Sequence, residues 1–212
     1  MSPFGPFYCV FRWDLNGFAY SEPPRSPETL FRYAAPEEIV SVAQVWYEGL
    51  GDEPGSPWAD YLTRWTPITA SKWFLDSRKR MGARFLVAER DKAVVGMNGM
   101  ILEKQSGIGR FFTGAVVRST ERKRGIGSML LYVSLRDIKA EGLRKAEVET
   151  REGISASKYL YPKYGGQKHT VQKLILLIGP YSSSKTITSF VFFTMSPKTP
   201  LYRVALIEVS SM

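Results

Sequence analysis

The sequence predicts an α/β fold of the α+β type, in which a mixed, twisted sheet of six to seven strands is flanked by helices. Two apolar runs at 85–88 and 93–97 are joined by a polar turn, which indicates a β-hairpin. Residues 125–141 repeat apolar side chains at helical spacing, and residues 145–151 alternate like a half-buried strand. With 44% hydrophobic and 23% charged residues, the 212-residue chain has the composition of one globular domain.

The first half of the chain is expected to contain one strand and three helices before the hairpin. Residues 1–28 are rich in proline and aromatic side chains and are expected to form an irregular N-terminal arm. A short strand follows at 29–35. Pro36 and two carboxylates then begin a helix that ends near Gly51. Two more helical patterns cover 56–65 and 69–81, the second with Thr69 as its N-cap.

The second half alternates strands and helices. A strand at 111–117 precedes the helix 125–141, and the strand 145–151 precedes a short helix at 155–164. Strand-like runs close the chain at 171–178, 187–195 and 202–209. We therefore divide the chain into an N-terminal arm (1–28), a main α/β domain (29–178) and a C-terminal extension with extra strands (179–212).

The net charge of +9 and the isoelectric point of about 9.6 favour anionic partners. Residues 106–169 hold 13 Lys and Arg against 6 Asp and Glu, a net of +7, whereas residues 1–105 have a net of −1. A single cysteine, Cys9, excludes an intramolecular disulfide and indicates a reducing compartment. A single histidine, His169, excludes a histidine-rich metal site and disfavours a Ser-His-Asp triad. No apolar run could span a bilayer, so a cytoplasmic protein without a membrane partner is expected.

The segment 116–128 has the pattern of an anion-binding loop. A strand ends at Val117, a basic loop follows, and Gly125 and Gly127 begin a long helix. The first amides of a helix have no intrahelical acceptor and the helix dipole adds partial positive charge, so this end favours phosphate. Glycines allow the backbone to approach a phosphate closely because they have no Cβ. The nucleotide P-loop pattern is absent, and Leu130 stands where a dinucleotide fingerprint needs a third glycine.

The pattern that fits is Arg-x-x-Gly-x-Gly on Arg122, Gly125 and Gly127. Here the sequence resembles the Gcn5-related N-acetyltransferase (GNAT) family, whose acetyl-coenzyme A signature has this form between a strand and a helix. The block 160–166, Leu-Tyr-Pro-Lys-Tyr-Gly-Gly, is similar to a second element of the family, and one helix and one strand separate the two blocks. Gly166 stands where the family usually has phenylalanine. The resemblance covers about 29–178.

The resemblance implies a role for each matching residue. The backbone of Val116, Val117 and Arg118 would pair with the pantetheine arm of acetyl-CoA. The pyrophosphate would lie on the amides of the loop and first helical turn, formed by Arg122, Lys123, Arg124, Gly125, Ile126, Gly127 and Ser128. Tyr161 would protonate the departing thiolate of coenzyme A, and the acetyl group would pass directly to an amine. No metal is implied.

The direct reaction needs a neutral amine, so a carboxylate or a water chain must accept its proton. Glu149, on the strand after the cofactor helix, is the candidate, although its position on the polar face also fits a surface residue. Tyr161 could equally be a packing tyrosine at a helix end. Four tryptophans in the first helical region are expected in the core, with an acceptor-pocket wall as the alternative; they are Trp46, Trp58, Trp65 and Trp73.

The sequence therefore predicts an acetyl-CoA-dependent N-acetyltransferase acting on a primary amine of a small molecule or a peptide, with a homodimer possible. A non-catalytic acyl-CoA sensor with the same loop is the principal alternative. A basic nucleic-acid-binding domain is the third, and it is disfavoured because the excess charge falls on the loop that the phosphate prediction already explains.

Overall fold

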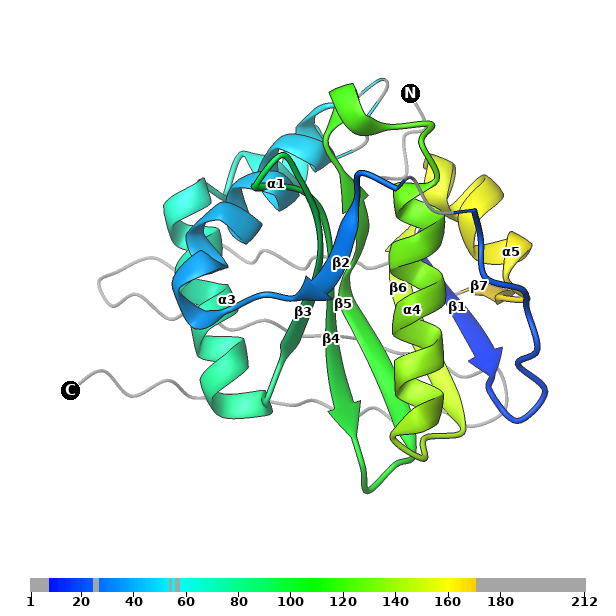
Figure 1. Cartoon of the computed structure of the whole chain (residues 1–212). Helices are drawn as coiled ribbons and strands as arrows, with labels where there is room; N and C mark the ends of the chain where they lie inside the picture. The colour runs from blue at the N-terminus through cyan, green and yellow to red at the C-terminus, as the bar shows by residue number, and fades with distance from the viewer. Residues whose placement is uncertain (1–7, 25–26, 54, 56–57, 171–212) are drawn as a thin grey trace, which may run out of the picture.

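Seven strands form one mixed sheet in the order β2-β3-β4-β5-β6-β1-β7 (Figure 1). The computed structural model describes residues 8–24, 27–53, 55 and 58–170. The strands are β1 (Tyr8–Asp14), β2 (Leu30–Tyr33), β3 (Arg84–Arg90), β4 (Ala93–Glu103), β5 (Ile108–Val117), β6 (Lys145–Arg151) and β7 (Gln167–Thr170). The α-helices are α1 (Ile39–Gly51), α2 (Ala59–Leu62), α3 (Pro67–Met81), α4 (Ile126–Ala140) and α5 (Tyr161–Lys163). The 3-10 turns η1 (Pro36–Glu38) and η2 (Ser119–Glu121) and the π-helical turn η3 (Ala156–Leu160) complete the order.

The predicted α/β class with a mixed sheet is confirmed, but the prediction of an irregular arm is wrong for residues 8–14. These residues form β1, which pairs antiparallel with both β6 and β7. Cys9, Phe11 and Trp13 alternate along it and are 1%, 1% and 2% exposed. This period of two fits a strand with one face in the core. The neighbouring prolines and aromatic residues hid that alternation in the sequence. The predicted runs from 171 onward lie outside the described residues.

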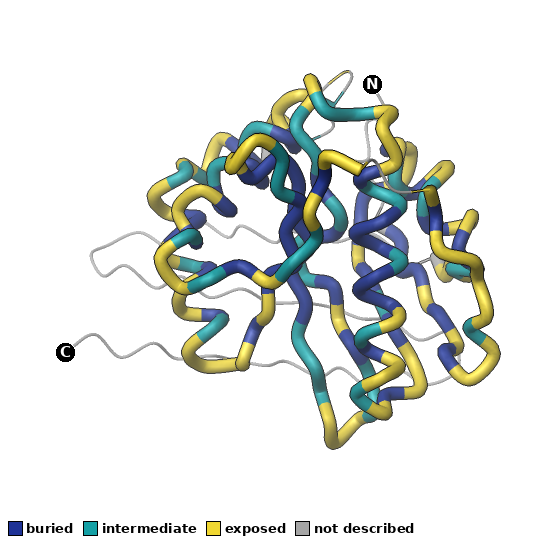
Figure 2. Tube along the Cα trace, viewed as in Figure 1, coloured by how far each residue is buried: buried dark blue, intermediate teal, exposed yellow. Residues whose placement is uncertain are grey.

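Helices cover the two faces of the sheet unequally. The helix α4 packs on one face, where its buried side chains join β1, β5 and β6 in one core cluster. The helices α1 and α3 pack on the other face, over β3, β4 and β5, in a second cluster. Buried residues follow the central strands and the inner side of α4, whereas turns and outer helix faces are exposed (Figure 2).

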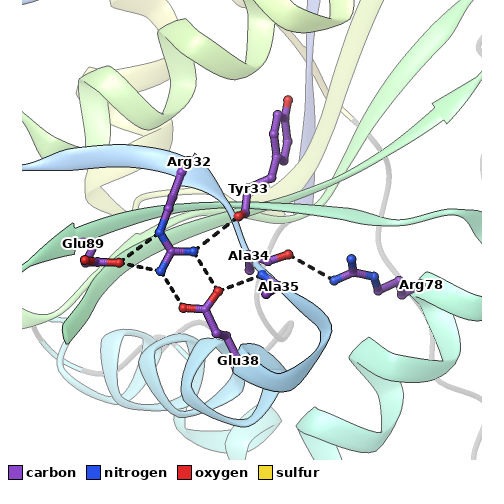
Figure 3. Close-up of polar contacts among 7 residues, drawn as sticks. All are labelled: Arg32, Tyr33, Ala34, Ala35, Glu38, Arg78 and Glu89. Atoms are coloured by element: carbon purple, nitrogen blue, oxygen red, sulfur yellow. Dashed lines mark hydrogen bonds and ion pairs between the residues drawn. The ribbon is translucent and has the colours of Figure 1, made fainter. Parts of the chain in front are cut away.

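An arginine fastens the edge strand β2 to its neighbours (Figure 3). The Arg32 guanidinium donates to Glu89 on β3 and to both carboxylate oxygens of Glu38, at 2.7 and 2.5 Å. Glu38 also accepts the Ala35 amide at 2.7 Å, which places its carboxylate at the start of the α1 region. The hydrogen bonds from Arg32, and then that from Ala35, lower the pKa of Glu38 to about 2. The short edge strand β2 is therefore held by the ion pairs of Arg32 as well as by backbone pairing with β3.

Helix boundaries depart from the predicted ones by a few residues. The helix α3 begins at Pro67, and its N-cap is Thr66, whose hydroxyl accepts the Thr69 amide at 3.2 Å. The predicted N-cap at Thr69 is therefore one turn too late. Thr69 lies inside the first turn of α3, where it exchanges hydrogen bonds with the true N-cap, Thr66. Within the described residues, no helix is both long and apolar enough to cross a bilayer.

Candidate functional site

The strands β5 and β6 separate part-way along their length. They pair in parallel only from Ile108 opposite Lys145 to Phe111 opposite Val148. Beyond that point the backbone groups of β5 that face β6 have no partner strand. On this side of β5, the backbone amides and carbonyls therefore need partners other than a neighbouring strand.

A β-bulge produces the separation. Gly99 on β4 faces Gly114 on β5, but the next pair along is Met100 with Phe111, so Phe112 and Thr113 are extra residues in β5. The Thr113 hydroxyl accepts the Gly99 amide at 2.6 Å, which secures the bulge. Gly114 has a φ of +68°, a conformation that a side chain disfavours. Bulges of this kind bend a strand away from its neighbour.

The hydroxyl of Tyr161 lies at this gap and bridges the two strands. It is hydrogen-bonded to the Ala115 amide of β5 and to the Thr150 side chain of β6. A Cβ built on Gly114 would lie 2.8 Å from the hydroxyl oxygen. The ring packs against Phe11 and Trp13 and is 2% exposed. Burial raises the pKa of Tyr161 well above its ordinary value, outweighing the lowering effect of the Ala115 bond. The phenol therefore stays protonated and can donate.

A π-helical turn delivers Tyr161 to this position. The Tyr161 amide donates to the carbonyl of Ala156, one residue further back than in an α-helix. Pro162 follows and has no amide to continue the ordinary α-helical pattern. A turn widened in this way re-aims the side chains after it, and such turns are frequent at functional sites. Tyr161 consequently points into the core toward the gap, while Tyr159 is 72% exposed.

The predicted phosphate loop follows directly after β5. Lys123 and Gly125 have φ values of +64° and +79°, and Gly125 is the N-cap of α4. The first intrahelical bond runs from the Met129 amide to the Gly125 carbonyl at 3.0 Å. The amides of Ile126, Gly127 and Ser128 therefore have no intrahelical acceptor, and no other acceptor for them lies among the residues that the structure describes. These groups fit an anion such as a pyrophosphate.

The basic side chains of the loop differ in what they contact. Arg122 donates to backbone carbonyls, and Arg118 lies 3.1 Å from Glu48. Arg124 lies 3.6 Å from Glu121. Lys123 is exposed and meets no carboxylate in the described part of the chain. Lys123 is thus the side chain of this loop with the most freedom to meet a ligand, whereas Arg122 serves the fold.

The remaining predicted cofactor residues divide between backbone and packing roles. The Arg118 amide donates to the Val95 carbonyl at 3.0 Å and is therefore engaged within the sheet. Because amide direction alternates along a strand, the Val116 amide also faces β4, and the Val117 amide faces the gap. Val116 and Ile126 are buried in opposite core clusters. Ser128 is hydrogen-bonded to Tyr164.

Glu149 is the first residue of β6 beyond the last pair with β5. Its neighbours Val148 and Thr150 face α4, so Glu149 lies on the opposite face of the sheet from Tyr161. The residue is exposed, yet surrounding protein atoms partly desolvate its carboxylate and raise its pKa, with Arg110 acting in the opposite direction. Glu147 differs because Arg12 and Arg110 each hold its carboxylate at 3.0 Å.

The tryptophans predicted for the core lie mainly there. Trp46, Trp65 and Trp73 have ring centroids 5.1 to 5.8 Å apart and belong to the cluster beneath α1 and α3. Trp73 also meets Phe112 of the bulge at 5.4 Å, so this cluster extends to the gap. Trp58 stacks with the Arg151 guanidinium at 4.7 Å. The described residues contain no group of three or more potential metal ligands.

Comparison with known proteins assigns the chain to a family. The sequence model of the acetyltransferase (GNAT) family matches residues 43–165, more than half of the chain. The chain belongs to the GNAT acetyltransferase family. The matched range contains the loop before α4, the β5–β6 gap and Tyr161. No curated protein matches the sequence.

Solved structures of this family share the GNAT fold. A PaiA N-acetyltransferase from Thermoplasma acidophilum, in complex with coenzyme A, has a TM-score of 0.56 and 16% identity, over 64% of this chain and 87% of that one. A GCN5-related N-acetyltransferase from Sphaerobacter thermophilus has a TM-score of 0.59 and 19% identity, over 79% and 50%. A ribosomal-protein-alanine N-acetyltransferase from Brucella melitensis has a TM-score of 0.52 and 23% identity, over 64% and 83%.

The sequence interpretation missed two parts of the gap. Gly114 and Thr150 had no assigned role, although both surround the Tyr161 hydroxyl. A glycine inside a strand pattern is a recognised sign of a bulge, so Gly114 could have been found. Thr150 could not, because its role depends on which residue of a distant segment faces it.

Proposed function

We propose that this protein transfers an acetyl group from acetyl-CoA to a primary amine of a small molecule or a peptide. The observation that carries the proposal is the β5–β6 gap, which has a buried, protonated tyrosine on one face and a carboxylate of raised pKa on the other. The loop with unpaired amides adjoins the same gap, because it begins where β5 ends.

The residues that would hold acetyl-CoA are mainly backbone groups. The amides of Ile126, Gly127 and Ser128 suit the pyrophosphate, and Lys123 can add its charge. Gly125 is exposed, and a Cβ built there would stand over the start of α4 at 3.5 Å from the Pro24 carbonyl. The Val117 amide faces the gap and suits the pantetheine arm.

The chemistry requires one proton acceptor and one proton donor. When bound, acetyl-CoA supplies an activated thioester that an amine can attack directly. Glu149 accepts the proton of the amine, and its raised pKa makes it a better acceptor than an ordinary glutamate. Tyr161 donates to the sulfur that leaves, and burial keeps this phenol protonated until then. Because Tyr161 and Glu149 lie on opposite faces, the donor and the acceptor do not compete for one position.

The single described cysteine, Cys9, is a free thiol and buried on β1, where burial raises its pKa. A buried neutral thiol is unreactive, so the proposal has no acyl-enzyme on cysteine. A free buried thiol is also compatible with the reducing cytoplasm, which is where we place the reaction.

An amine panel tests the proposal. Full-length protein is incubated with acetyl-CoA and a set of polyamines, aminoglycosides, amino acids and peptides with free N-termini, and thiol release is followed. At least one primary amine is expected to accelerate thiol release above the rate of hydrolysis. Coenzyme A binding without release for any amine would favour the acyl-CoA sensor. An absence of coenzyme A binding would contradict both functions.

A further inference from the structure

We infer that Glu53 is a positioning residue, whose carboxylate fastens the segment carrying Tyr161 to the phosphate-binding loop. The inference deepens the proposed function and rests on it for its catalytic meaning. The contacts themselves need no cofactor, so they can be tested separately.

Glu53 follows α1, and its two carboxylate oxygens serve two different segments. Oε1 accepts the amide of Ser155 at 2.9 Å and the hydroxyl of Ser155 at 2.7 Å. Oε2 lies 3.8 Å from Nη1 of Arg122. The Glu53 side chain is 16% exposed, so water and salt screen these interactions less than those of a surface pair. One carboxylate thus joins the end of α1, the loop before α4 and the start of η3.

The Arg122 side chain completes this junction. Its Nη2 and Nη1 donate to the carbonyls of Gly49 and Asp52 at 2.7 and 3.0 Å, and its Nε donates to Val117 at 3.2 Å. Carbonyls at the end of a helix have no intrahelical donor, and a cation there also meets the negative end of the helix dipole. The guanidinium therefore holds the end of α1 against the end of β5 rather than contributing free charge to a ligand.

Backbone hydrogen bonds continue from Ser155 to Tyr161. Ser155 immediately precedes the π-helical turn, and its amide is one of the donors that the turn leaves unpaired. Within the turn, Lys158 donates to the Ile154 carbonyl at 3.0 Å and Tyr161 donates to Ala156. Glu53 holds the first residue of this segment, and the β5–β6 gap holds the Tyr161 hydroxyl at its end. Loss of Glu53 would release Ser155 and leave only the contacts of the Tyr161 hydroxyl at the gap.

The sign of the charge separates positioning from ligand binding. A carboxylate beside a pyrophosphate site repels the ligand unless a cation offsets it, and Arg122 provides that cation. Removing Glu53 is therefore expected to leave coenzyme A affinity unchanged or improved. Removing Glu53 is expected to displace Tyr161 and therefore to lower turnover.

Hydrogen exchange on the full-length protein without cofactor tests the contact. Glu53→Ala is expected to raise the exchange rates of amides 155–161 about tenfold, the scale of a lost charge-assisted hydrogen bond, with α4 unchanged. Glu48→Ala is the matched control, because Glu48 lies near the end of α1, just before Glu53, and pairs with Arg118 rather than with Ser155. An increase at 155–161 no larger than that in Glu48→Ala would overturn the inference.

Kinetics test the catalytic meaning. With an amine identified by the panel, Glu53→Ala is expected to lower kcat about tenfold while the KM for acetyl-CoA stays within about twofold, and Glu53→Gln to recover part of the loss. An unchanged kcat together with a raised KM for acetyl-CoA would overturn the positioning role. If wild-type protein binds no coenzyme A, the proposed function fails, and the exchange result still decides whether Glu53 anchors the segment.

Discussion

The two parts of the candidate site are built in different ways. The loop before α4 is continuous in sequence, and its shape follows from local backbone geometry at Lys123 and Gly125, with φ values of +64° and +79°. The Tyr161 hydroxyl instead lies among groups of two strands, Gly114 and Ala115 of β5 and Thr150 of β6, while Tyr161 itself comes from α5, a third segment. The loop can tolerate exchange of several side chains, whereas the gap depends on packing to within a fraction of an ångström.

This difference predicts different roles for the two regions, cofactor binding for the loop before α4 and proton transfer for the β5–β6 gap. Backbone amides that recognise phosphate need the correct chain path but few particular side chains. Proton transfer needs particular side chains at particular positions. Substitutions in the loop should therefore affect binding, and substitutions around the gap should affect turnover.

The largest expected effect is a loss of cofactor binding in Gly125→Glu. The new side chain would be forced into a left-handed conformation at φ +79° and would bring a negative charge to the proposed phosphate site. Calorimetry should show coenzyme A affinity reduced about hundredfold or more. Gly142→Glu is the control, because Gly142 follows the other end of α4 with φ +80° and has nothing within 4 Å of a built Cβ. Equal affinities in the two variants would contradict the placement of the phosphate site.

Tyr161→Phe is expected to lower turnover by about a hundredfold, within the range of a lost proton donor, and to leave coenzyme A affinity within about twofold. Steady-state kinetics at saturating substrates and calorimetry measure the two quantities. Tyr164→Phe removes another buried hydroxyl, one that is hydrogen-bonded to Ser128 rather than placed at the gap, and should keep most of the turnover. Full turnover in Tyr161→Phe would remove Tyr161 as the donor.

Glu149→Gln should change the pH dependence of the reaction. A protonated carboxyl cannot accept a proton, so wild-type kcat/KM for the amine should fall as pH falls through the pKa of Glu149. Because desolvation raises that pKa, the fall should occur at a higher pH than for an ordinary glutamate. Glu149→Gln should lack this limb and react at least about tenfold more slowly. Glu147→Gln is the control and should retain the wild-type pH profile, because Arg12 and Arg110 already hold the Glu147 carboxylate. A wild-type pH profile in Glu149→Gln would exclude Glu149 as the base.

The smallest expected effect concerns the shape of the bulge. Gly114→Ala and Gly107→Ala share the same backbone cost, because their φ values are +68° and +69°. Only Gly114 has the Tyr161 hydroxyl at 2.8 Å from a built Cβ, whereas nothing lies within 4 Å at Gly107. Chemical denaturation should therefore show Gly114→Ala to be less stable than Gly107→Ala by about 1–3 kcal/mol. Equal free energies of unfolding would mean that the bulge can absorb the methyl group.

Parts of the fold that depend on short-range patterns could be predicted from the sequence. The hairpin, the helix before residue 141 and the strand 145–151 all appear in the structure, since their periodicities are complete within each segment. The strand β1 was not predicted, because neighbouring prolines and aromatic residues hide its alternation and its partners β6 and β7 lie more than 100 residues away.

The amino-acid sequence by itself determined the loop before α4, because its glycines, its basic residues and the periodicity of the following helix lie within a few positions of one another. It also determined that Tyr161 and Glu149 were candidates. Only the tertiary structure decided that Tyr161 bridges Ala115 and Thr150, that Glu149 lies on the opposite face, and that Arg122 contacts Gly49 and Glu53. These relations follow from strand register, the bulge in β5 and helix docking, which bring together residues distant along the chain.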